Sequence, residues 1–241
     1  MKTFDVIIPL YNEEGSLVNT LGAIRNFSKT YPHFRFIFVN DGSTDQTLKI
    51  LKKNIKNPLR EFRIVSYRDN RGKGFAIRKG IEFSTSSNIA FIDADLAYPL
   101  NHLLSIEKSL ETSDVVIGCR GLSSINWERI NLKRIFIGKS FNILLRTILF
   151  LPYKDTQAGL KGFKKNIAKK IFSKQKINGF AFDTEVLYLA KKYGASIEEI
   201  SAEVSEDHST SPSKVKIVRD SINMFTSLFK IRLNDLAKNY S

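Results

Sequence analysis

The amino-acid sequence predicts an α/β domain with a mostly parallel sheet, and two observations support this prediction. Short apolar runs alternate with amphipathic helical stretches, which is the rhythm of βαβ units. With 241 residues, of which 42% are hydrophobic, the chain is long enough for one large core. We therefore expect a single sheet with helices packed against it.

The expected strands are short apolar runs bounded by polar turns: 4–9, 34–39, 62–67, 89–92, 115–118 and about 196–204. The expected helices begin near Ser16, after the turn at Asp41 and Gly42, after Gly74 and at Asp183. The stretch 126–151 is predicted to be helical with a broad apolar face. The stretch 155–163 is predicted to be a polar loop that leads into a basic helix.

The end of the chain, residues 211–241, is predicted to form an amphipathic basic helix outside the main domain, which spans 1–210. Its apolar positions are Val215, Val218, Ile222, Phe225, Phe229, Leu233 and Leu236, widened by Ile217, Met224, Leu228 and Ile231. More than half of the helix circumference is therefore apolar. Such a helix must be buried against the domain, against a partner subunit in a homodimer, or on a membrane surface.

The formal net charge is +14, and much of it is concentrated between residues 120 and 174. This segment contains 13 lysines and arginines but 2 acidic residues. A local positive field attracts nucleic acid, anionic lipid headgroups or phosphorylated substrates. An ordinary solvated surface in a lysine-rich chain is the alternative interpretation.

Cysteine content and apolar run length indicate the cellular compartment. The single cysteine, Cys119, excludes an internal disulfide framework, and the N-terminus has no signal-peptide pattern. The most apolar stretch, 135–151, is interrupted by Lys139 and Arg146, so no transmembrane helix is expected. A cytoplasmic location is the resulting expectation.

The run Phe91-Ile92-Asp93-Ala94-Asp95 ends a predicted buried strand with two carboxylates. In open α/β sheets, ligands bind at the carboxyl ends of the strands. Side chains alternate along a strand, so Asp93 and Asp95 would point to the same side, where two oxygen ligands suit Mg²⁺ or Mn²⁺ with a phosphorylated ligand. A helix N-cap or a surface turn is the alternative interpretation.

Four polar clusters follow successive predicted strands, and parallel strands would bring all four to one edge of the sheet. They are 9–13, Asp41, 71–74 and the Asp93/Asp95 pair. Lys73 lies between two glycines at a helix start, where free backbone N–H groups and a cation would suit a phosphate. Gly-Lys-Gly alone is more often an ordinary loop, so this prediction depends on the four clusters together.

With these residues in place, the sequence resembles the inverting family 2 glycosyltransferases of the GT-A type. It is most similar to the branch that transfers a sugar from a nucleotide-sugar to dolichyl or polyprenyl phosphate. The resemblance covers residues 4–215 and rests on ordered motifs at 6–13, 39–45, 71–74, 93–95, 118–120, 155–159 and 182–185. It implies a Rossmann-like GT-A fold and a Mg²⁺ or Mn²⁺ cofactor.

The resemblance also implies roles on the donor side. The implied donor-binding residues are Pro9, Tyr11, Glu13, Asp41, Lys73, Asp93 and Lys214. Asp95 would ligate the metal ion that bridges the diphosphate. The mannosyl members carry a glutamine two residues after this aspartate, where the present chain has Ala97. Water or another side chain would then complete the metal's ligand set.

On the acceptor side, Arg120 and Arg134 match the arginines that receive the lipid phosphate in this branch. A phosphate acceptor is already an anion near neutral pH, so it needs cations and no general base. A sugar hydroxyl would instead need a carboxylate, for which Asp183 is the candidate. Asp183 and Glu185 are equally well explained as a helix-start pair that satisfies free N–H groups.

The leading hypothesis is an inverting enzyme that moves a hexose from UDP-glucose or GDP-mannose to a polyprenyl phosphate. Its motif at 155–161, which includes Gln157 and Lys161, looks closer to the glucosyl members. The enzyme would lie peripherally on the inner face of a membrane, held by the 211–241 helix and the basic 120–174 segment. The residues expected to act directly in the reaction are Asp93, Asp95, Arg120 and Asp183.

Two alternatives remain at this stage. One is a family 2 transferase that extends a glycan. The other is a basic nucleic-acid-binding or lipid-binding module without catalysis. A nucleic-acid binder predicts aromatic residues between the basic ones, whereas 120–174 carries aliphatic residues and scattered phenylalanines. No nucleic-acid partner is therefore expected.

Overall fold

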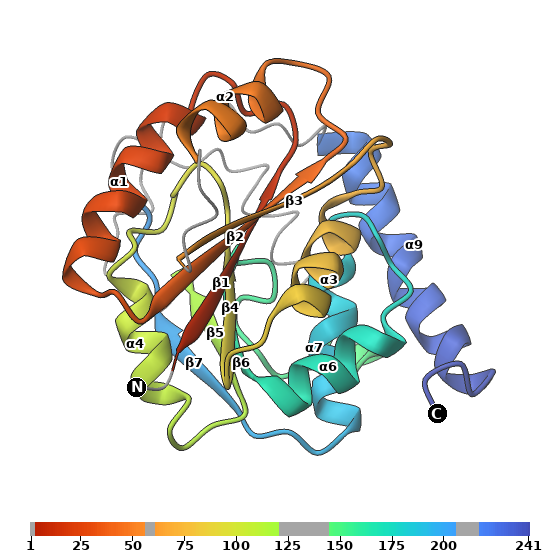
Figure 1. Cartoon of the computed structure of the whole chain (residues 1–241). Helices are drawn as coiled ribbons and strands as arrows, with labels where there is room; N and C mark the ends of the chain where they lie inside the picture. Colours follow the sequence, from red (N-terminus) through yellow and green to blue (C-terminus); the bar gives the residue numbers. More distant parts are fainter. Residues whose placement is uncertain (1–2, 56–60, 121–144, 206–216) are drawn as a thin grey trace, which may run out of the picture.

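The computed structural model of the protein describes residues 3–55, 61–120, 145–205 and 217–241, with side chains from residue 224 onward in the last range. Seven strands form one sheet in the order β3-β2-β1-β4-β6-β5-β7 (Figure 1). They are β1 (Phe4–Leu10), β2 (Phe34–Asp41), β3 (Phe62–Tyr67), β4 (Asn88–Ile92), β5 (Val115–Cys119), β6 (Leu160–Lys164) and β7 (Ile197–Ser201). Only β6 pairs in the antiparallel sense within this sheet, with β4 and with β5.

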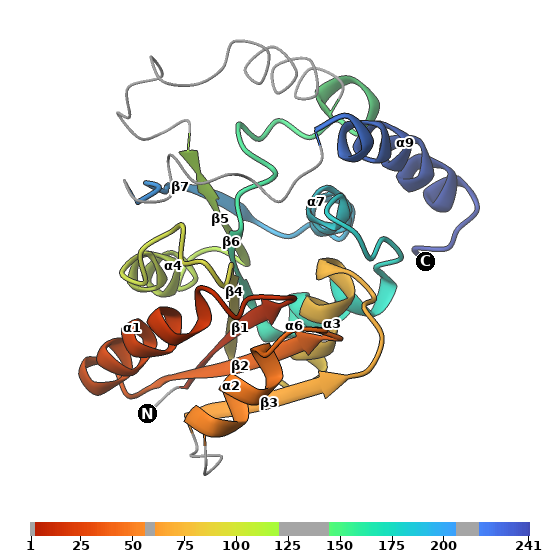
Figure 2. The same cartoon turned by 90° about the horizontal axis from the view of Figure 1, so that it is seen from above.

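Helices cover both faces of the sheet (Figure 2). They are α1 (Leu17–Thr30), α2 (Thr47–Asn54), α3 (Lys73–Phe83), α4 (His102–Ser109), α6 (Lys165–Lys174), α7 (Phe182–Lys192) and α9 (Ile217–Leu236). One core joins the sheet to α1, α2 and α4, and a second core joins it to α3, α6, α7 and α9. The predicted α/β architecture is confirmed.

Alternating side chains of β1 enter these two different cores. Val6 and Ile8 pack in the α1 core, whereas Ile7 packs in the α3 core, and all three are fully buried. A strand that is buried on both faces reads as a continuous apolar run, which is why β1, β2 and β4 were predictable from sequence.

One prediction about the central sheet is wrong. Leu160–Lys164 lies mostly inside the predicted 155–163 loop, yet it is strand β6, placed between β4 and β5. Lys161 and Gly162 interrupt the apolar pattern that would indicate a strand. Lys161 is fully buried, and it is accommodated there because its charge is matched by Asp183, a partner distant in sequence.

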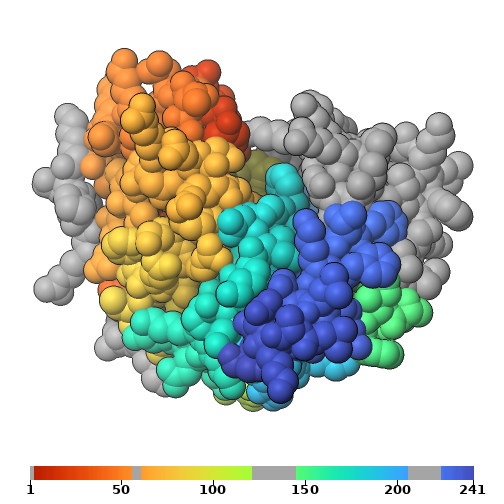
Figure 3. Space-filling view, turned by 90° about the vertical axis from the view of Figure 1, so that its right-hand side faces the viewer, coloured from red at the N-terminus to blue at the C-terminus, as the bar shows by residue number. Residues whose placement is uncertain are grey.

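The last helix, α9, packs against the domain along one edge. Leu228 and Ile231 are buried in the α3 core, but Phe229, Leu233 and Leu236 are 59%, 64% and 74% exposed. Figure 3 shows α9 lying beside the 145–151 segment, and hydrogen bonds from Tyr188 and Lys192 to Asp235 join it to α7. The sequence pattern thus located the helix but not the edge that packs. The predicted boundary near residue 210 lies outside the described residues, so the domain division stays a prediction.

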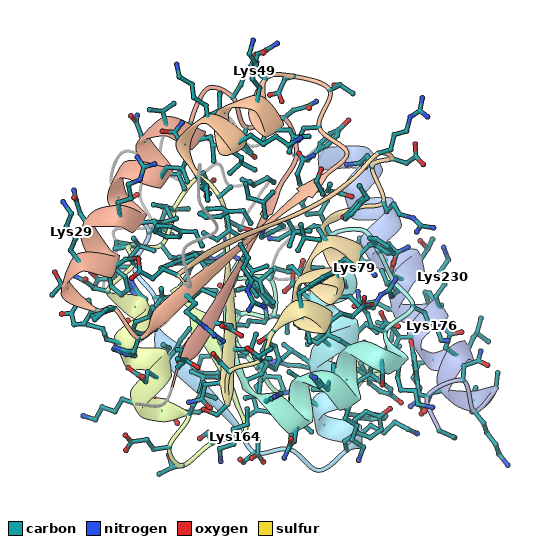
Figure 4. All side chains as sticks on the ribbon, in the orientation of Figure 1. Lys29, Lys49, Lys79, Lys164, Lys176 and Lys230 are labelled. Carbon is teal, nitrogen blue, oxygen red and sulfur yellow. The ribbon has the colours of Figure 1, made fainter. Side chains whose placement is uncertain are left out.

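Positive charge surrounds this fold on many elements. Figure 4 labels six lysines that lie on different parts of the chain: Lys29, Lys49, Lys79, Lys164, Lys176 and Lys230. Within the predicted basic segment 120–174, residues 121–144 lie outside the described residues. The described helices include none that is both long and apolar enough to cross a membrane.

Candidate active site

Hydrogen bonds join the loops that follow β1 and β2. The N–H of Asn12 donates to Ser43 Oγ at 3.1 Å, and the N–H of Thr44 donates to Asn12 Oδ1 at 2.8 Å. The N–H of Glu13 donates to Thr47 Oγ1 at 2.8 Å. These contacts fix Glu13 at the carboxyl edge of the sheet. Pro9 lies near the end of β1, and the side chain of Tyr11 is exposed beside this loop.

Asp41, the last residue of β2, organises the loop that precedes α3. Its Oδ1 accepts the N–H of Arg71 at 2.8 Å, and its Oδ2 accepts the N–H of Gly72 at 2.8 Å. The side-chain amide of Asn70 donates to the same Oδ2 at 3.0 Å. Because the Asp41 side chain is buried, these donors replace its hydration. Asp41 therefore holds the backbone that places Lys73.

Lys73 and Asp93 meet across the sheet edge. Lys73 is the first residue of α3, and its Nζ lies 2.5 Å from Oδ1 of Asp93 at the end of β4. Burial alone would lower the pKa of Lys73, but the negative charges of Asp93, Asp183 and Asp95 outweigh burial and raise that pKa. The ammonium group therefore stays charged at neutral pH, in contact with Asp93 and in the field of Asp183 and Asp95.

A second close contact fixes Asp93 from the opposite side. A Cβ atom at Gly159 would lie 1.8 Å from Asp93 Oδ2, so only glycine permits the chain before β6 to pass here. The neighbouring Asp95 is exposed, and its Oδ1 accepts the N–H of Ala97 at 3.1 Å. Asp93 is thus partly buried and held by Lys73, whereas Asp95 is exposed and open to a ligand.

The described residues contain no group of three or more His, Cys, Asp or Glu side chains placed to hold a metal ion. A Mg²⁺ ion in nucleotide sites is commonly held by one or two carboxylates together with phosphate oxygens and water. The exposed carboxylate of Asp95 fits such a shared site. Ala97 offers no side-chain ligand, and its N–H instead orients Asp95. The donor set therefore fits a metal ion that is held jointly with a diphosphate.

A buried ion pair lies close to this edge of the sheet, which we call the rim. Lys161 of β6 donates from Nζ to Oδ1 of Asp183 at 2.6 Å and to the carbonyl oxygen of Ala158 at 2.6 Å. Asp183 is 3% exposed. Burial raises the pKa of Asp183, while the charges of Lys161 and Lys73 act in the opposite direction. Asp183 is therefore a buried carboxylate at the start of α7, and the positive charge of Lys161 balances its negative charge.

Arg120 and Asp155 form a second ion pair at the end of β5. Arg120 donates from Nε to Asp155 Oδ2 at 2.6 Å and from its Nη2 to Oδ1 at 3.0 Å. Burial would raise the pKa of Asp155, but the Arg120 guanidinium outweighs it and lowers that pKa. The same loop carries Gln157, whose side-chain amide donates to Thr184 Oγ1 at 3.0 Å. Two loop residues are thus tied to β5 and α7.

The structure brings most of the predicted site residues to one edge, but their individual roles stay predictions. Arg134 and Lys214 lie outside the described residues. Glu185 has a structural role instead, since its carboxylate accepts the N–H groups of Lys176 and Ile177. Sequence reasoning did not find Arg78 or Asn178, which join α3 to the loop before α7. Neither residue belongs to a recognisable motif, so no sequence signal marked them.

Comparison with known proteins identifies the family. The profile described as "Glycosyl transferase family 2" matches residues 5–172. A dolichyl-phosphate beta-glucosyltransferase from Dictyostelium discoideum is 32% identical over 96% of this chain and 74% of its own. The protein of the same name from Saccharomyces cerevisiae is 34% identical over 95% of this chain and 73% of its own.

Solved structures show the same fold. Glucosyl-3-phosphoglycerate synthase from Mycobacterium tuberculosis, crystallised with UDP, has a TM-score of 0.66 at 15% identity and covers 95% of this chain and 80% of its own. Mannosyl-3-phosphoglycerate synthase from Rubrobacter xylanophilus has a TM-score of 0.66 at 16% identity and covers 98% and 74%. With the GT-A fold and the profile in agreement, the chain belongs to family 2 of the glycosyltransferases.

Proposed function

We propose that this protein transfers glucose from UDP-glucose to dolichyl phosphate or a similar polyprenyl phosphate. The observation that carries the proposal is the meeting of Lys73, Asp93 and Asp95 at the sheet edge where family 2 enzymes are expected to bind a nucleotide-sugar. The names of the relatives from Dictyostelium discoideum and Saccharomyces cerevisiae support glucose and a dolichyl carrier. A neighbour of the same fold crystallised with UDP supports a uridine nucleotide.

The donor side would stabilise the leaving diphosphate. Displacement at the anomeric carbon builds negative charge on the departing nucleoside diphosphate, and groups aimed at that charge lower the barrier most. Lys73 supplies a fixed ammonium group there, since Asp41 and Asp93 hold its loop and its tip. A divalent ion on Asp95 would act as a Lewis acid toward the same diphosphate oxygens. Neighbours of this fold were crystallised with Mn²⁺ or Mg²⁺.

The state of Asp183 favours a phosphate acceptor over a sugar hydroxyl. A hydroxyl acceptor needs a carboxylate within hydrogen-bond reach as a general base. Asp183 is the candidate from sequence, but it is buried and its Oδ1 is bound by Lys161. A phosphate acceptor is already an anion, so it needs no proton transfer. The pairing of Asp183 with Lys161 therefore supports transfer to a lipid phosphate.

Arg120 remains the described candidate for binding the acceptor phosphate. Asp155 fixes its guanidinium through two hydrogen bonds, yet the Arg120 side chain is half-exposed. A guanidinium binds phosphate through charge-assisted hydrogen bonds, and the exposed part of Arg120 is accessible to such a ligand. Asp155 would in this way orient Arg120 toward the acceptor.

The exposed stripe of α9 supports a membrane location. Phe229, Leu233 and Leu236 remain exposed while the opposite edge of the helix packs on the domain. Phe150 is also exposed, and the Arg232 guanidinium lies 5.9 Å from its ring centroid. Apolar side chains with nearby cations are typical of helices that lie in a lipid interface. We propose that this stripe, Phe150 included, faces the membrane that carries the acceptor, on its cytoplasmic side.

A direct assay tests the proposed reaction. Purified protein with Mn²⁺ should transfer glucose from UDP-glucose to a short polyprenyl phosphate, and GDP-mannose should be a poor donor. The product is a phosphodiester between the sugar and the lipid. Alkaline phosphatase hydrolyses phosphate monoesters such as the acceptor but not this diester, so the product can be separated and quantified. Transfer to free saccharides at a higher rate than to polyprenyl phosphate would contradict the proposal and favour glycan extension.

Vesicle binding tests the membrane assignment separately. A double variant with Phe229→Ser and Leu233→Ser should co-sediment much less with vesicles of phosphatidylcholine and phosphatidylserine than the unaltered protein does. Ala237→Ser is the control, because Ala237 is also exposed near the C-terminal end of the chain; this variant should bind vesicles like the unaltered protein. If the double variant still binds vesicles but loses a dimer in sedimentation analysis, the stripe is a homodimer interface instead.

A further inference from the structure

Glu185 is a fully buried carboxylate that the proposed reaction does not use. It lies in the first turn of α7 and is 0% exposed. Its Oε1 accepts the N–H of Lys176 at 2.9 Å, and its Oε2 accepts the N–H of Ile177 at 2.8 Å. Burial raises the pKa of Glu185, and hydrogen bonds from Tyr240 and these two amides oppose the shift. Glu185 thus fixes the 176–177 backbone.

The third donor to Glu185 comes from the far end of the chain. The hydroxyl of Tyr240 lies 2.5 Å from Glu185 Oε1, and the Tyr240 ring is 0% exposed. Tyr240 packs in the same core as Leu228 and Ile231, the residues by which α9 docks. Its carbonyl oxygen accepts a hydrogen bond from the Tyr193 hydroxyl at 2.9 Å. Tyr240 is therefore held by the core packing of its ring and by Tyr193.

The segment that Glu185 fixes is also bound to α3. Arg78 of α3 donates to the carbonyl oxygen of Gln175 at 2.8 Å and to Oδ1 of Asn178 at 3.2 Å. The side-chain amide of Gln175 donates to the carbonyl oxygen of Ile177 at 2.7 Å. These bonds make residues 175–178 one rigid connector between α7 and α3.

The connector ends on the loop that carries Lys73. The carbonyl oxygen of Asn178 accepts the N–H of Gly74 at 2.7 Å. Gly72 has φ +97°, and a Cβ there would lie 2.6 Å from the same carbonyl oxygen. Lys73 stands between these two contacts. A shift of Asn178 would therefore move the backbone from which Lys73 reaches Asp93.

We propose that Glu185 and Tyr240 are positioning residues for donor binding, through which the Tyr240 hydroxyl helps to set the place of Lys73. The path runs from Tyr240 to Glu185, then through the 175–178 connector to the N–H of Gly74. It deepens the proposed function, because it rests on Lys73 contacting the donor diphosphate. Loss of the Tyr240 hydroxyl should weaken nucleotide binding, although Tyr240 follows α9 and is far from Lys73 in the sequence.

The test uses Glu185→Gln and Tyr240→Phe in the full chain. In Glu185→Gln, the side-chain NH₂ group replaces one of the two carboxylate oxygens. In either orientation it faces the backbone N–H of Lys176 or of Ile177, and that N–H loses its acceptor. We expect UDP to bind about ten-fold more weakly in the presence of Mn²⁺, the effect of roughly one buried hydrogen bond. Tyr240→Phe, which removes one hydroxyl, should weaken binding about three-fold. In turnover, KM for the donor should rise while KM for the acceptor stays unchanged.

Asp235→Asn is the matched control. Asp235 also anchors α9, by accepting hydrogen bonds from the Tyr188 hydroxyl and Lys192 Nζ, but it has no contact with the connector. It should lower thermal stability without changing the Kd for UDP. Equal weakening of UDP binding in all three variants would mean a general loss of stability and would overturn the proposal.

Hydrogen exchange separates failure of this inference from failure of the proposed function. The amide of Gly74 should exchange faster in Glu185→Gln and Tyr240→Phe than in Asp235→Asn. If the unaltered protein does not bind UDP, the donor site is wrong, but faster exchange at Gly74 still supports the coupling. Unchanged Gly74 exchange together with unchanged UDP affinity in both variants would refute the coupling, even in an active enzyme.

Discussion

The two sides of the candidate site hold their buried carboxylates in different ways. On the donor side, after β1 to β4, the buried Asp41 accepts hydrogen bonds from neutral backbone and amide groups. On the β6 side, Asp183 and Asp155 are each paired with a cation. Neutral donors fix a loop without adding charge, whereas a buried ion pair becomes costly when one partner is removed. We therefore expect stability to depend most on the β6 side and transfer most on the donor side.

Lys161→Met should have the largest effect, because it leaves the buried Asp183 without its main cation. We expect a loss of about 3–5 kcal/mol in the free energy of unfolding, measured by urea titration at neutral pH. In this variant the folded state binds a proton at Asp183 more readily than the unfolded chain does. The lost stability should thus be partly regained as pH falls from neutrality toward the ordinary range of an aspartate.

Lys164→Met on the same strand is the control for this prediction. Lys164 pairs with Asp114 at 3.3 Å, and both side chains are well exposed. Its loss should cost less than about 1 kcal/mol. If the two lysine variants are equally stable, the β6 side does not have the importance assigned to it.

Asp95→Asn should abolish most transfer and leave the fold intact. The exposed Asp95 contributes one hydrogen bond to the protein, so unfolding stability should change by less than about 0.5 kcal/mol. Loss of the metal-binding carboxylate should lower kcat by about 10²–10³-fold. Asp69→Asn, an exposed aspartate in the loop after β3, should retain full activity. Normal turnover in Asp95→Asn would remove the metal assignment.

Asp41→Asn should have an intermediate effect. An amide nitrogen in place of one carboxylate oxygen must face a backbone N–H of Arg71 or Gly72, which leaves that group unpaired. The expected loss is about 1–3 kcal/mol of stability, with a raised KM for the nucleotide-sugar. Denaturant titration and donor kinetics measure the two effects. A loss as large as that of Lys161→Met would erase the contrast between the two sides.

Arg120→Gln should cost much less stability than Lys161→Met. Arg120 is half-exposed, so solvent screens its pair with Asp155 and the loss should be about 1 kcal/mol or less. The pair lowers the pKa of Asp155 below its ordinary value of 3.8. Its contribution is therefore present above that pH and lost as pH falls through the lowered value. Acid titration should show the two proteins converging below 3.8, and a constant difference would contradict this assignment.

Several features of the site could be predicted from particular residues. The apolar run before Asp93 indicated a buried strand, and the turn at Asp41 indicated where the preceding parallel strand ends. Because parallel strands share a direction, their polar ends had to lie at one edge. The contacts of Asp41 with the 70–72 loop and of Lys73 with Asp93 agree with that reasoning.

Other features could not be predicted, because they depend on partners far apart in sequence. Lys161 reads as a loop residue until Asp183 is seen beside it, and this hid strand β6. The apolar positions of α9 looked equivalent, yet Leu228 and Ile231 are buried while Leu233 is exposed. Periodicity gives the direction of each side chain around a helix axis, but not the surface that the helix meets.

The sequence by itself determined the family, the mostly parallel sheet and the edge at which its polar residues gather, because periodicity and strand direction are local properties of the chain. Tertiary structure alone decided which charges neutralise one another, where β6 inserts and how Tyr240 reaches Glu185. Those outcomes depend on burial, since a charge or hydroxyl removed from water must find a partner wherever the fold supplies one.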